Sequence, residues 1–251
     1  MSRNIMLSLC FDGSAYHGWQ LQKNAVSVQQ KINEALDSVF HENANVIGCS
    51  RTDAGVHALR FCCNFHTRKT IPCEKIPDAV NAYLPRDISV FAAKETAPDF
   101  HARFSCVGKE YIYRILNTRY RDPFYENRAL MYPYQLDTEL LGREISAFVG
   151  RHDFSAFCCS GSDVTDKVRT IRAADVVKDG DIVTVRVSGD GFLYNMARII
   201  VGTLLYVNEG KIPAGSVPSV IESKDRDRAG FTAPAQGLYL SNVYYTEEEF
   251  L

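Results

Sequence analysis

The stretch Gly48–Leu59, GCSRTDAGVHAL, lies between two apolar runs that have the pattern of β-strands. The residues TDAG are typical of a turn, because Gly55 can adopt a positive φ and Asp53 can hydrogen-bond to nearby backbone. The same turn places an arginine, an aspartate and a histidine within seven residues, and loops held by rigid strands often carry catalytic groups. The stretch therefore leaves two interpretations of Asp53 open, a turn former and a reactive carboxylate.

Strand and helix patterns alternate on both sides of this loop. Apolar residues at helical spacing, a capping-box signal at Ser27 and Gln30, and the hairpin signal KDGD at 178–181 support the pattern. The predicted strands are 5–11, 59–66, 88–93, 110–116, 171–177, 182–187 and 237–245, and the predicted helices are 28–40, 74–83, 139–148 and 192–207. The alternation indicates an α+β or mixed α/β fold of two similar halves, residues 1–105 and 106–251.

The composition is that of an ordinary globular protein, with 251 residues of which 46% are hydrophobic and 23% charged. No apolar run reaches the ~18 residues that a membrane span needs, and the N-terminus lacks the pattern of a signal peptide. The cytoplasm is therefore the expected location. The eight cysteines show no C-x2-C spacing, so we expect no metal site.

The charge is unevenly distributed, although the net charge is only −2. Residues 101–128 hold six Lys/Arg against three acids, a balance of +3, whereas residues 209–251 hold four against seven, a balance of −3. This asymmetry suits a face that binds a polyanion, and it equally suits solvated surface.

Arg198 lies within FLYNMARIIVGTLL at 192–205, where a charged side chain is unusual. At 100° per residue, one helical face is entirely apolar and should face the core: Leu193, Met196, Ile200, Leu204 and Val207. The opposite face groups Arg198 with Tyr194, Gly191 and Gly202, which predicts room for another group to approach. A buried arginine needs a carboxylate, for which Asp53 is one candidate, whereas an arginine that caps a carbonyl or reaches solvent needs none.

The further candidates are two tyrosines, two histidines and one arginine. Tyr111 and Tyr113 alternate in EYIYRIL and share one strand face, either as core aromatics or with one ring stacked on a flipped base. In FHARFS at 100–105, His101 and Arg103 alternate with aromatics, which suits contact with a nucleic-acid backbone and also suits a strand edge. Nothing obvious orients His57 as a base, which favours a structural role.

Five ordered segments resemble the TruA family of tRNA pseudouridine synthases. They extend nearly from end to end with matching order and spacing: FDGSAYHGWQLQ, SRTDAGVHAL, FHARFS followed by KEYIYRI, GFLYNMARIIVGTL and APAQGLYLSNVYY. One position differs, because Ser50 stands where the family often has glycine before Arg-Thr-Asp. If that position needs a positive φ, the serine is strained; otherwise the change is neutral.

The resemblance implies a fold, a reaction and partners. The fold has two similar ferredoxin/RRM-like halves, a mostly antiparallel central sheet flanked by helices, and a catalytic cleft between the halves. The reaction isomerises uridine to pseudouridine at positions 38, 39 or 40 of the tRNA anticodon stem-loop, through a catalytic aspartate and a flipped-out base. The expected protein is a homodimer that binds tRNA and uses neither metal nor organic cofactor.

The resemblance also implies the role of each site residue. Asp53 would be the catalytic residue, and it could attack the sugar, attack the base, or act as a base on the ribose. Tyr111 would pack against the target base, and Arg198 would form an ion pair with Asp53. Arg51 would help to extrude the uridine or hold its phosphate. The other expected substrate-binding residues are His57, His101 and Arg103.

Two other function classes remain as alternatives. A non-catalytic RNA-binding protein or chaperone would keep the basic patch and the tyrosines but would not need the pair Asp53–Arg198. A glycosidase-like hydrolase would need a second carboxylate about 5 to 10 Å from Asp53, and the sequence offers no convincing one.

Overall fold

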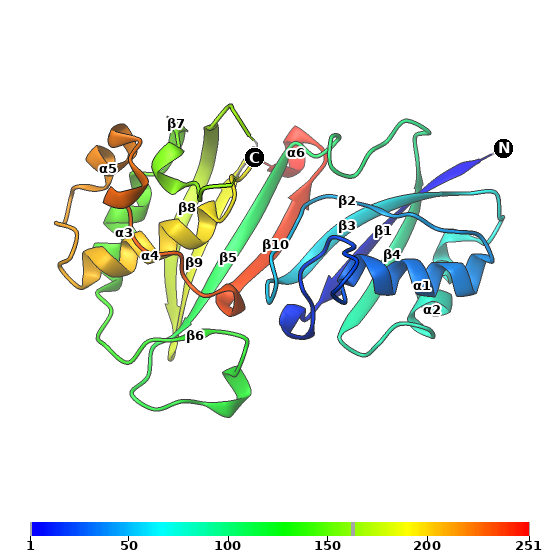
Figure 1. Ribbon diagram of the computed structural model, residues 1–251, viewed down its shortest axis with the longest axis horizontal. Coiled ribbons are helices and arrows are strands. Elements are labelled where there is room, and N and C mark those ends of the chain that lie inside the picture. Colours follow the sequence, from blue (N-terminus) through cyan, green and yellow to red (C-terminus); the bar gives the residue numbers. More distant parts are fainter. Residues whose placement is uncertain (1, 162–163, 251) are drawn as a thin grey trace. The chain divides into compact units, whose positions relative to one another are not determined.

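The computed structural model describes residues 2–161 and 164–250, and the chain divides into two compact units (Figure 1). The first unit comprises Met1–Val107 with Tyr239–Leu251, and the second comprises Gly108–Leu238. Each unit has a mostly antiparallel sheet flanked by helices, so the predicted mixed fold class is confirmed. No helix in the described part of the chain is long and apolar enough to cross a membrane.

The first unit has the strand order β4-β1-β3-β2, in which all neighbours are antiparallel. With α1 and α2 as the connections between strands, this is the ferredoxin-like arrangement. Its elements are β1 (Arg3–Phe11), α1 (Val28–Phe40), β2 (Ile47–Gly48), β3 (His57–Thr67), α2 (Ile76–Asn81), β4 (Ile88–Thr96), β10 (Leu238–Tyr244) and α6 (Glu247–Phe250).

Strand β10 returns to the first unit and pairs in parallel with the start of β3, with Tyr239 opposite His57. The sequence pattern predicts this strand in the second half, with the boundary after residue 105. The grouping differs because the pairing partner of β10 lies about 180 residues earlier, which a local pattern does not reveal.

Helix α1 begins and ends where the sequence predicts. The Ser27 hydroxyl accepts a hydrogen bond from Gln30 N at 3.3 Å, which satisfies one donor of the first turn. The reciprocal half of the capping box does not form, because the Gln30 amide donates to Glu34 instead. The buried side chains of α1 include Ile32 and Leu36, and they contribute to the core of this unit.

The second unit has the strand order β5-β9-β8-β7, again antiparallel throughout, with β6 paired in parallel to β5. Helix α3 packs against β8 and α4. The elements are β5 (Gly108–Leu116), β6 (Leu130–Met131), α3 (Thr138–Ser146), β7 (Gly150–Asp153), β8 (Val168–Asp179), β9 (Ile182–Gly189), α4 (Met196–Asn208) and α5 (Val217–Ser223).

Helix α4 is buried on nearly all sides, which corrects the prediction of an open face around Arg198. The predicted apolar face is buried, and so are Ile199, Val201 and Leu205 on other sides. The face of Gly202 is covered by backbone, because an added Cβ would collide with the carbonyl oxygen of Phe231. Gly202 therefore allows the segment 229–233 to pack closely on α4 rather than leaving space for a ligand.

Candidate functional site

The loop between β2 and β3 presents Asp53 on a tight turn. Val56 N donates to the Asp53 carbonyl at 3.2 Å, and Gly55 has a φ of 78°. The turn interpretation is therefore confirmed. Around the turn, Arg51 is exposed and Asp53 is half-buried.

The segment after β1 is hydrogen-bonded to this loop, and two glycines allow the two backbones to come close. Trp19 N donates to the Thr52 carbonyl at 3.2 Å, and Gly55 N donates to Tyr16 O at 3.2 Å. A Cβ at Gly13 would collide with the carbonyl of Val56, and a Cβ at Gly18 would collide with that of Thr52. The two backbones therefore lie too close for any residue with a side chain.

We expect Gly18→Ala to destabilise the protein by about 2 kcal/mol or more, because φ is +85° and a Cβ would press on the loop backbone. The matched control is Gly215→Ala, where φ is +78° and nothing lies within 4 Å of an added Cβ. This control should lose only about 1 kcal/mol, the cost of the backbone conformation. Denaturant unfolding of both variants measures the difference, and equal losses would show that the close approach at Gly18 is not important.

The Thr52 side chain is a buried, unsatisfied group next to Asp53. It is 9% exposed, and its hydroxyl is without a hydrogen-bond partner among the described residues. Burying a hydroxyl without a partner is unfavourable, and such groups call for an explanation.

His57 packs within the first unit rather than facing solvent. The ring is 2% exposed and stacks on Tyr239 with centroids 4.5 Å apart. Its Nδ1 accepts from Gly13 N at 3.1 Å and lies 3.2 Å from Asp12 Oδ1. In the neutral ring Nδ1 can serve Gly13 only as an acceptor, and a protonated ring would donate to Asp12 instead. These contacts give His57 a structural role, and its predicted contact with substrate stays a prediction.

The segment FHARFS forms a turn rather than a strand edge. His101 Nδ1 accepts from the backbone N–H groups of Arg103 and Phe104, both at 3.2 Å, so the neutral ring carries its proton on Nε2. The ring stacks on Phe104 at 4.2 Å, and the guanidinium carbon of Arg103 lies 5.7 Å from the same phenyl centroid. Arg103 and Phe104 are both exposed, so this turn offers cationic and aromatic groups to solvent.

In the second unit, β5 supplies both tyrosines to a buried cluster. Tyr111 is 8% exposed and meets Phe192 edge-on with centroids 4.8 Å apart. Tyr113 donates its hydroxyl to Pro234 O at 2.7 Å. Burial raises the pKa of the Tyr113 phenol well above its ordinary value, and the nearby charge of Arg198 opposes that rise. Tyr113 is therefore a structural donor that stays protonated.

Arg198 is held by two acceptors within its own unit. Its Nε donates to Ala233 O at 2.6 Å, and its Nη1 donates to Asn195 Oδ1 at 2.7 Å. Ala233 N in turn donates to Arg198 O at 3.1 Å, which ties the segment after α5 to the helix. Asn195 adopts the left-handed conformation, with φ of 62°, immediately before α4 begins. These contacts fix the guanidinium plane. The alternative of an arginine that caps a carbonyl is confirmed, although the sequence did not identify Ala233 or Asn195 as the acceptors.

Asp53 belongs to the first unit and Arg198 to the second, so their predicted ion pair stays a prediction. Within the described residues, no cluster of three or more His, Cys, Asp or Glu could hold a metal ion. Independence from metals and cofactors likewise stays a prediction.

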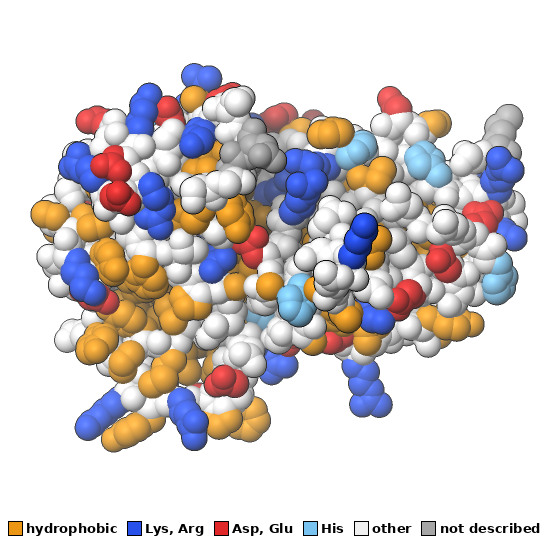
Figure 2. All heavy atoms as spheres, viewed as in Figure 1, with side chains coloured by type: hydrophobic (Ala, Val, Ile, Leu, Met, Phe, Trp, Pro, Cys, Tyr) orange, Lys and Arg blue, Asp and Glu red, His pale blue; other side chains and the backbone are white. Residues whose placement is uncertain are grey.

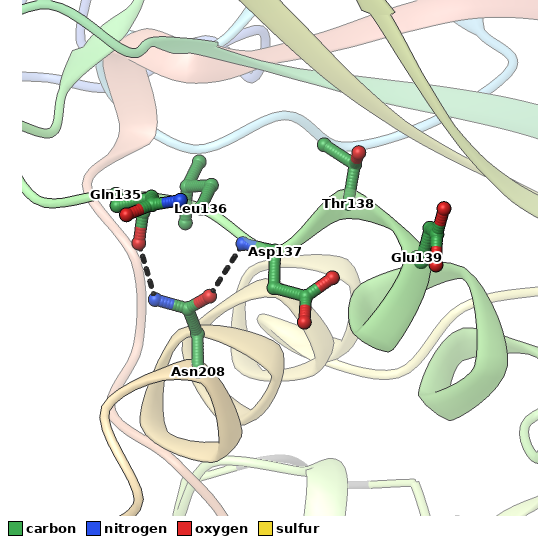
Figure 3. A pocket seen from close by; sticks show the side chains of 6 residues that line it. All are labelled: Gln135, Leu136, Asp137, Thr138, Glu139 and Asn208. Carbon is green, nitrogen blue, oxygen red and sulfur yellow. Dashed lines mark hydrogen bonds between the residues drawn. The ribbon is translucent and has the colours of Figure 1, made fainter.

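A shallow hollow at the start of α3 contains none of the predicted site residues (Figure 3). Three of the residues that line it, Gln135, Asp137 and Asn208, already bind one another. The Asn208 amide donates to Gln135 O and accepts from Asp137 N, both at 2.9 Å. The Asp137 carboxylate accepts from Leu140 N and caps α3. This hollow is therefore a helix junction and not a candidate active site.

Comparisons with known proteins point to one family. A sequence model described as tRNA pseudouridine synthase matches residues 9–105 and 145–246. The proteins named tRNA pseudouridine synthase A of Thermoanaerobacter pseudethanolicus and Acetivibrio thermocellus are each 47% identical over 97% of this chain and their whole length. The protein of that name from Clostridium acetobutylicum is 45% identical over the same shares. A chain of a solved Cbf5-Nop10-Gar1 complex aligns with 94% of this chain and over 57% of its own length, at 10% sequence identity. The TM-score of 0.38 is too low to support a structural argument.

Proposed function

Because the chain belongs to the tRNA pseudouridine synthase A family, we propose that it isomerises uridine to pseudouridine at positions 38 to 40 of the tRNA anticodon stem-loop. The observation that carries the proposal is Asp53 within SRTDAGVHAL, on a turn that two close backbone contacts hold in place. The relatives match along nearly the whole chain, so the similarity is not limited to this motif. Action on tRNA makes the cytoplasm the proposed location.

The reaction breaks the N1–C1′ bond of uridine, rotates the uracil and forms a C5–C1′ bond. It needs no net oxidation or hydrolysis, so a single positioned carboxylate can supply the chemistry as a nucleophile or as a base. The carboxylate of Asp53 is half-buried rather than enclosed, which leaves it within reach of a bound nucleotide.

The second unit supplies the other proposed site groups. A base inside a stem must leave its stack to react, at a cost of a few kcal/mol that protein contacts must offset. The ring of Tyr111, fixed by Phe192, is the proposed surface against which the uracil packs. The proposed role of Arg198 is an ion pair that stabilises the charged form of Asp53.

Cationic side chains of the first unit complete the proposed tRNA contacts. Arg51 is exposed two residues before Asp53, where it can hold a phosphate of the extruded nucleotide. His101 and Arg103 lie on a turn with hydrogen-bond donors available for the RNA backbone. A homodimer that binds one tRNA is part of the proposal, and so is catalysis without metal or cofactor.

Chemical mapping of the modified nucleotides tests the proposed positions. An unmodified tRNA transcript is incubated with the protein, treated with a carbodiimide that marks pseudouridine, and read by primer extension. We expect stops only at uridines 38 to 40. Stops that fall solely in another arm of the tRNA would contradict the proposed specificity, while leaving the reaction type intact.

Asn195→Gly should lower kcat about tenfold and leave KM within threefold, because a hydrogen bond to a charged group contributes about 1.5–3 kcal/mol. Glycine keeps the left-handed backbone of this position and removes the amide, whose oxygen accepts from Arg198 and whose nitrogen donates to Cys159 Sγ at 3.3 Å. Steady-state kinetics on tRNA measure the effect. An unchanged kcat would show that the Asn195 amide is not needed to position the arginine.

A further inference from the structure

The loop between β5 and β6 carries exposed aromatic and cationic side chains that the proposed reaction does not use. We call residues 117–129 the basic–aromatic loop (Figure 1). Tyr120 is 73% exposed and Phe124 is 84% exposed, and Arg119 and Arg121 beside them are exposed as well. Figure 2 shows cationic and hydrophobic side chains projecting at the lower left, where Figure 1 places this loop.

The basic–aromatic loop is anchored at both ends, so its crest has a defined conformation. The Asn117 amide donates to the carbonyls of Tyr132 and Tyr134 at 2.9 and 2.7 Å. At the other end Ala129 is buried, and its N–H donates to the carbonyl of Tyr125 at 3.2 Å. These contacts hold the ends of the loop before any partner binds, which lowers the ordering entropy that binding must offset.

The charges on the crest are arranged for an anionic partner. The guanidinium carbon of Arg119 lies 5.4 Å from the Tyr120 ring centroid, a cation–π contact. In the part of the chain that the structure describes, neither Arg119 nor Arg121 has an acidic partner. Asp122, which follows Arg121 in the sequence, accepts from Phe124 N at 2.9 Å and so caps the turn that carries the phenyl ring.

Two macromolecules could bind such a surface, and the pattern favours RNA. A stable protein interface buries about 800 Å² on each partner around a core depleted of charge. Here Tyr120 lies between Arg119 and Arg121, so cationic groups accompany the exposed rings instead of being depleted around them. Guanidinium groups beside exposed rings can bind a ribonucleotide, because the phosphate binds arginine and the base stacks on the ring.

We propose that the basic–aromatic loop is a second RNA contact, which binds tRNA nucleotides other than the reacting uridine. Arg119 and Arg121 bind phosphates, and an unpaired base stacks on Phe124 or Tyr120. This inference rests on the proposed function, because it takes tRNA as the partner. The loop also lies outside residues 9–105 and 145–246, the regions that the family's sequence model matches.

Salt-dependent tRNA binding tests the arginines. Binding is measured in an Asp53→Asn background, so that turnover does not alter the RNA. The double variant Arg119→Ala with Arg121→Ala should bind tRNA about tenfold more weakly at 0.1 M salt, with a salt slope smaller by about 1 to 2. The control variant Arg143→Ala with Arg151→Ala removes two exposed arginines of the same unit and should leave the slope unchanged.

The aromatic contact is tested separately with Phe124→Ala. Loss of one stacked base should weaken tRNA binding about 5- to 100-fold without changing the salt slope. Phe91→Ala, which removes a phenylalanine that is 50% exposed on β4, is the matched control and should bind normally.

Three outcomes would overturn this inference in distinguishable ways. Loop variants that bind tRNA like their parent, while the parent binds well, would overturn it and leave the proposed function standing. If a loop variant sediments without RNA at a lower mass than its parent, the loop binds a second copy of the chain instead of tRNA. Failure of the parent protein to bind tRNA at all would overturn the proposed function together with this inference.

Discussion

Asp53→Asn should reduce single-turnover pseudouridine formation on the order of 10³-fold or more, while tRNA affinity stays within about threefold. Asparagine has nearly the same shape as aspartate and is also a good turn residue, so the loop conformation should survive. The amide cannot act as a nucleophile or as a base at neutral pH. The loss should therefore appear in the chemical step and leave binding and unfolding free energy unchanged.

The control for this variant is Asp78→Asn, which removes the same charge from an exposed position on α2. It should retain full activity. An Asp53→Asn protein with normal turnover would exclude Asp53 as the catalyst and would favour the simple turn former that the sequence also allows.

Arg198→Ala should reduce kcat on the order of 10²-fold, because the guanidinium is proposed to stabilise the charged Asp53. Arg198→Lys should recover only part of the loss. A lysine ammonium keeps the charge, but it lacks the planar fork that reaches Ala233 O and Asn195 Oδ1 from one side chain. Free guanidinium added to Arg198→Ala at millimolar concentration should restore part of kcat, which a purely structural arginine would not show.

Arg186→Ala is the matched control for Arg198. Arg186 forms an exposed ion pair with Asp175 at 3.1 Å, and such pairs contribute little to stability. Its loss should leave both kcat and unfolding unchanged. If Arg198→Ala were fully active on tRNA, the proposed ion pair with Asp53 would be wrong.

Local signals predicted much of the fold. The apolar spacing and the Ser27 cap located α1 at both ends, and the KDGD turn located the hairpin of β8 and β9. Short elements were missed: β6 has two residues, β7 has four, and α5 has seven. Such segments show too few repeats for a period to be recognised. Helix α4 begins at Met196 rather than at residue 192, because Asn195 takes the left-handed conformation.

The sequence predicts the site residues whose side-chain type suggests a chemical role. It does not predict the contacts that are made by backbone groups. Asp53, Arg198 and Tyr111 could be named from their residue types and from the resemblance. The Ala233 carbonyl that holds Arg198, and the carbonyls that lie against Gly13 and Gly18, depend on which segments meet in space. The same holds for Gly202, whose small size admits the backbone of Phe231 rather than a ligand.

The most direct measurement is release of hydrogen from tRNA labelled at the C5 atoms of its uridines, with a chelator present and no added nucleotide. Forming the C5–C1′ bond must expel the C5 hydrogen, so release reports the proposed isomerisation itself. We predict release from uridines of the anticodon stem-loop by the wild-type protein, and none by Asp53→Asn. If the wild-type protein binds tRNA tightly and in a salt-sensitive way but releases no label, the proposed isomerisation is wrong. That result would indicate a non-catalytic RNA-binding protein.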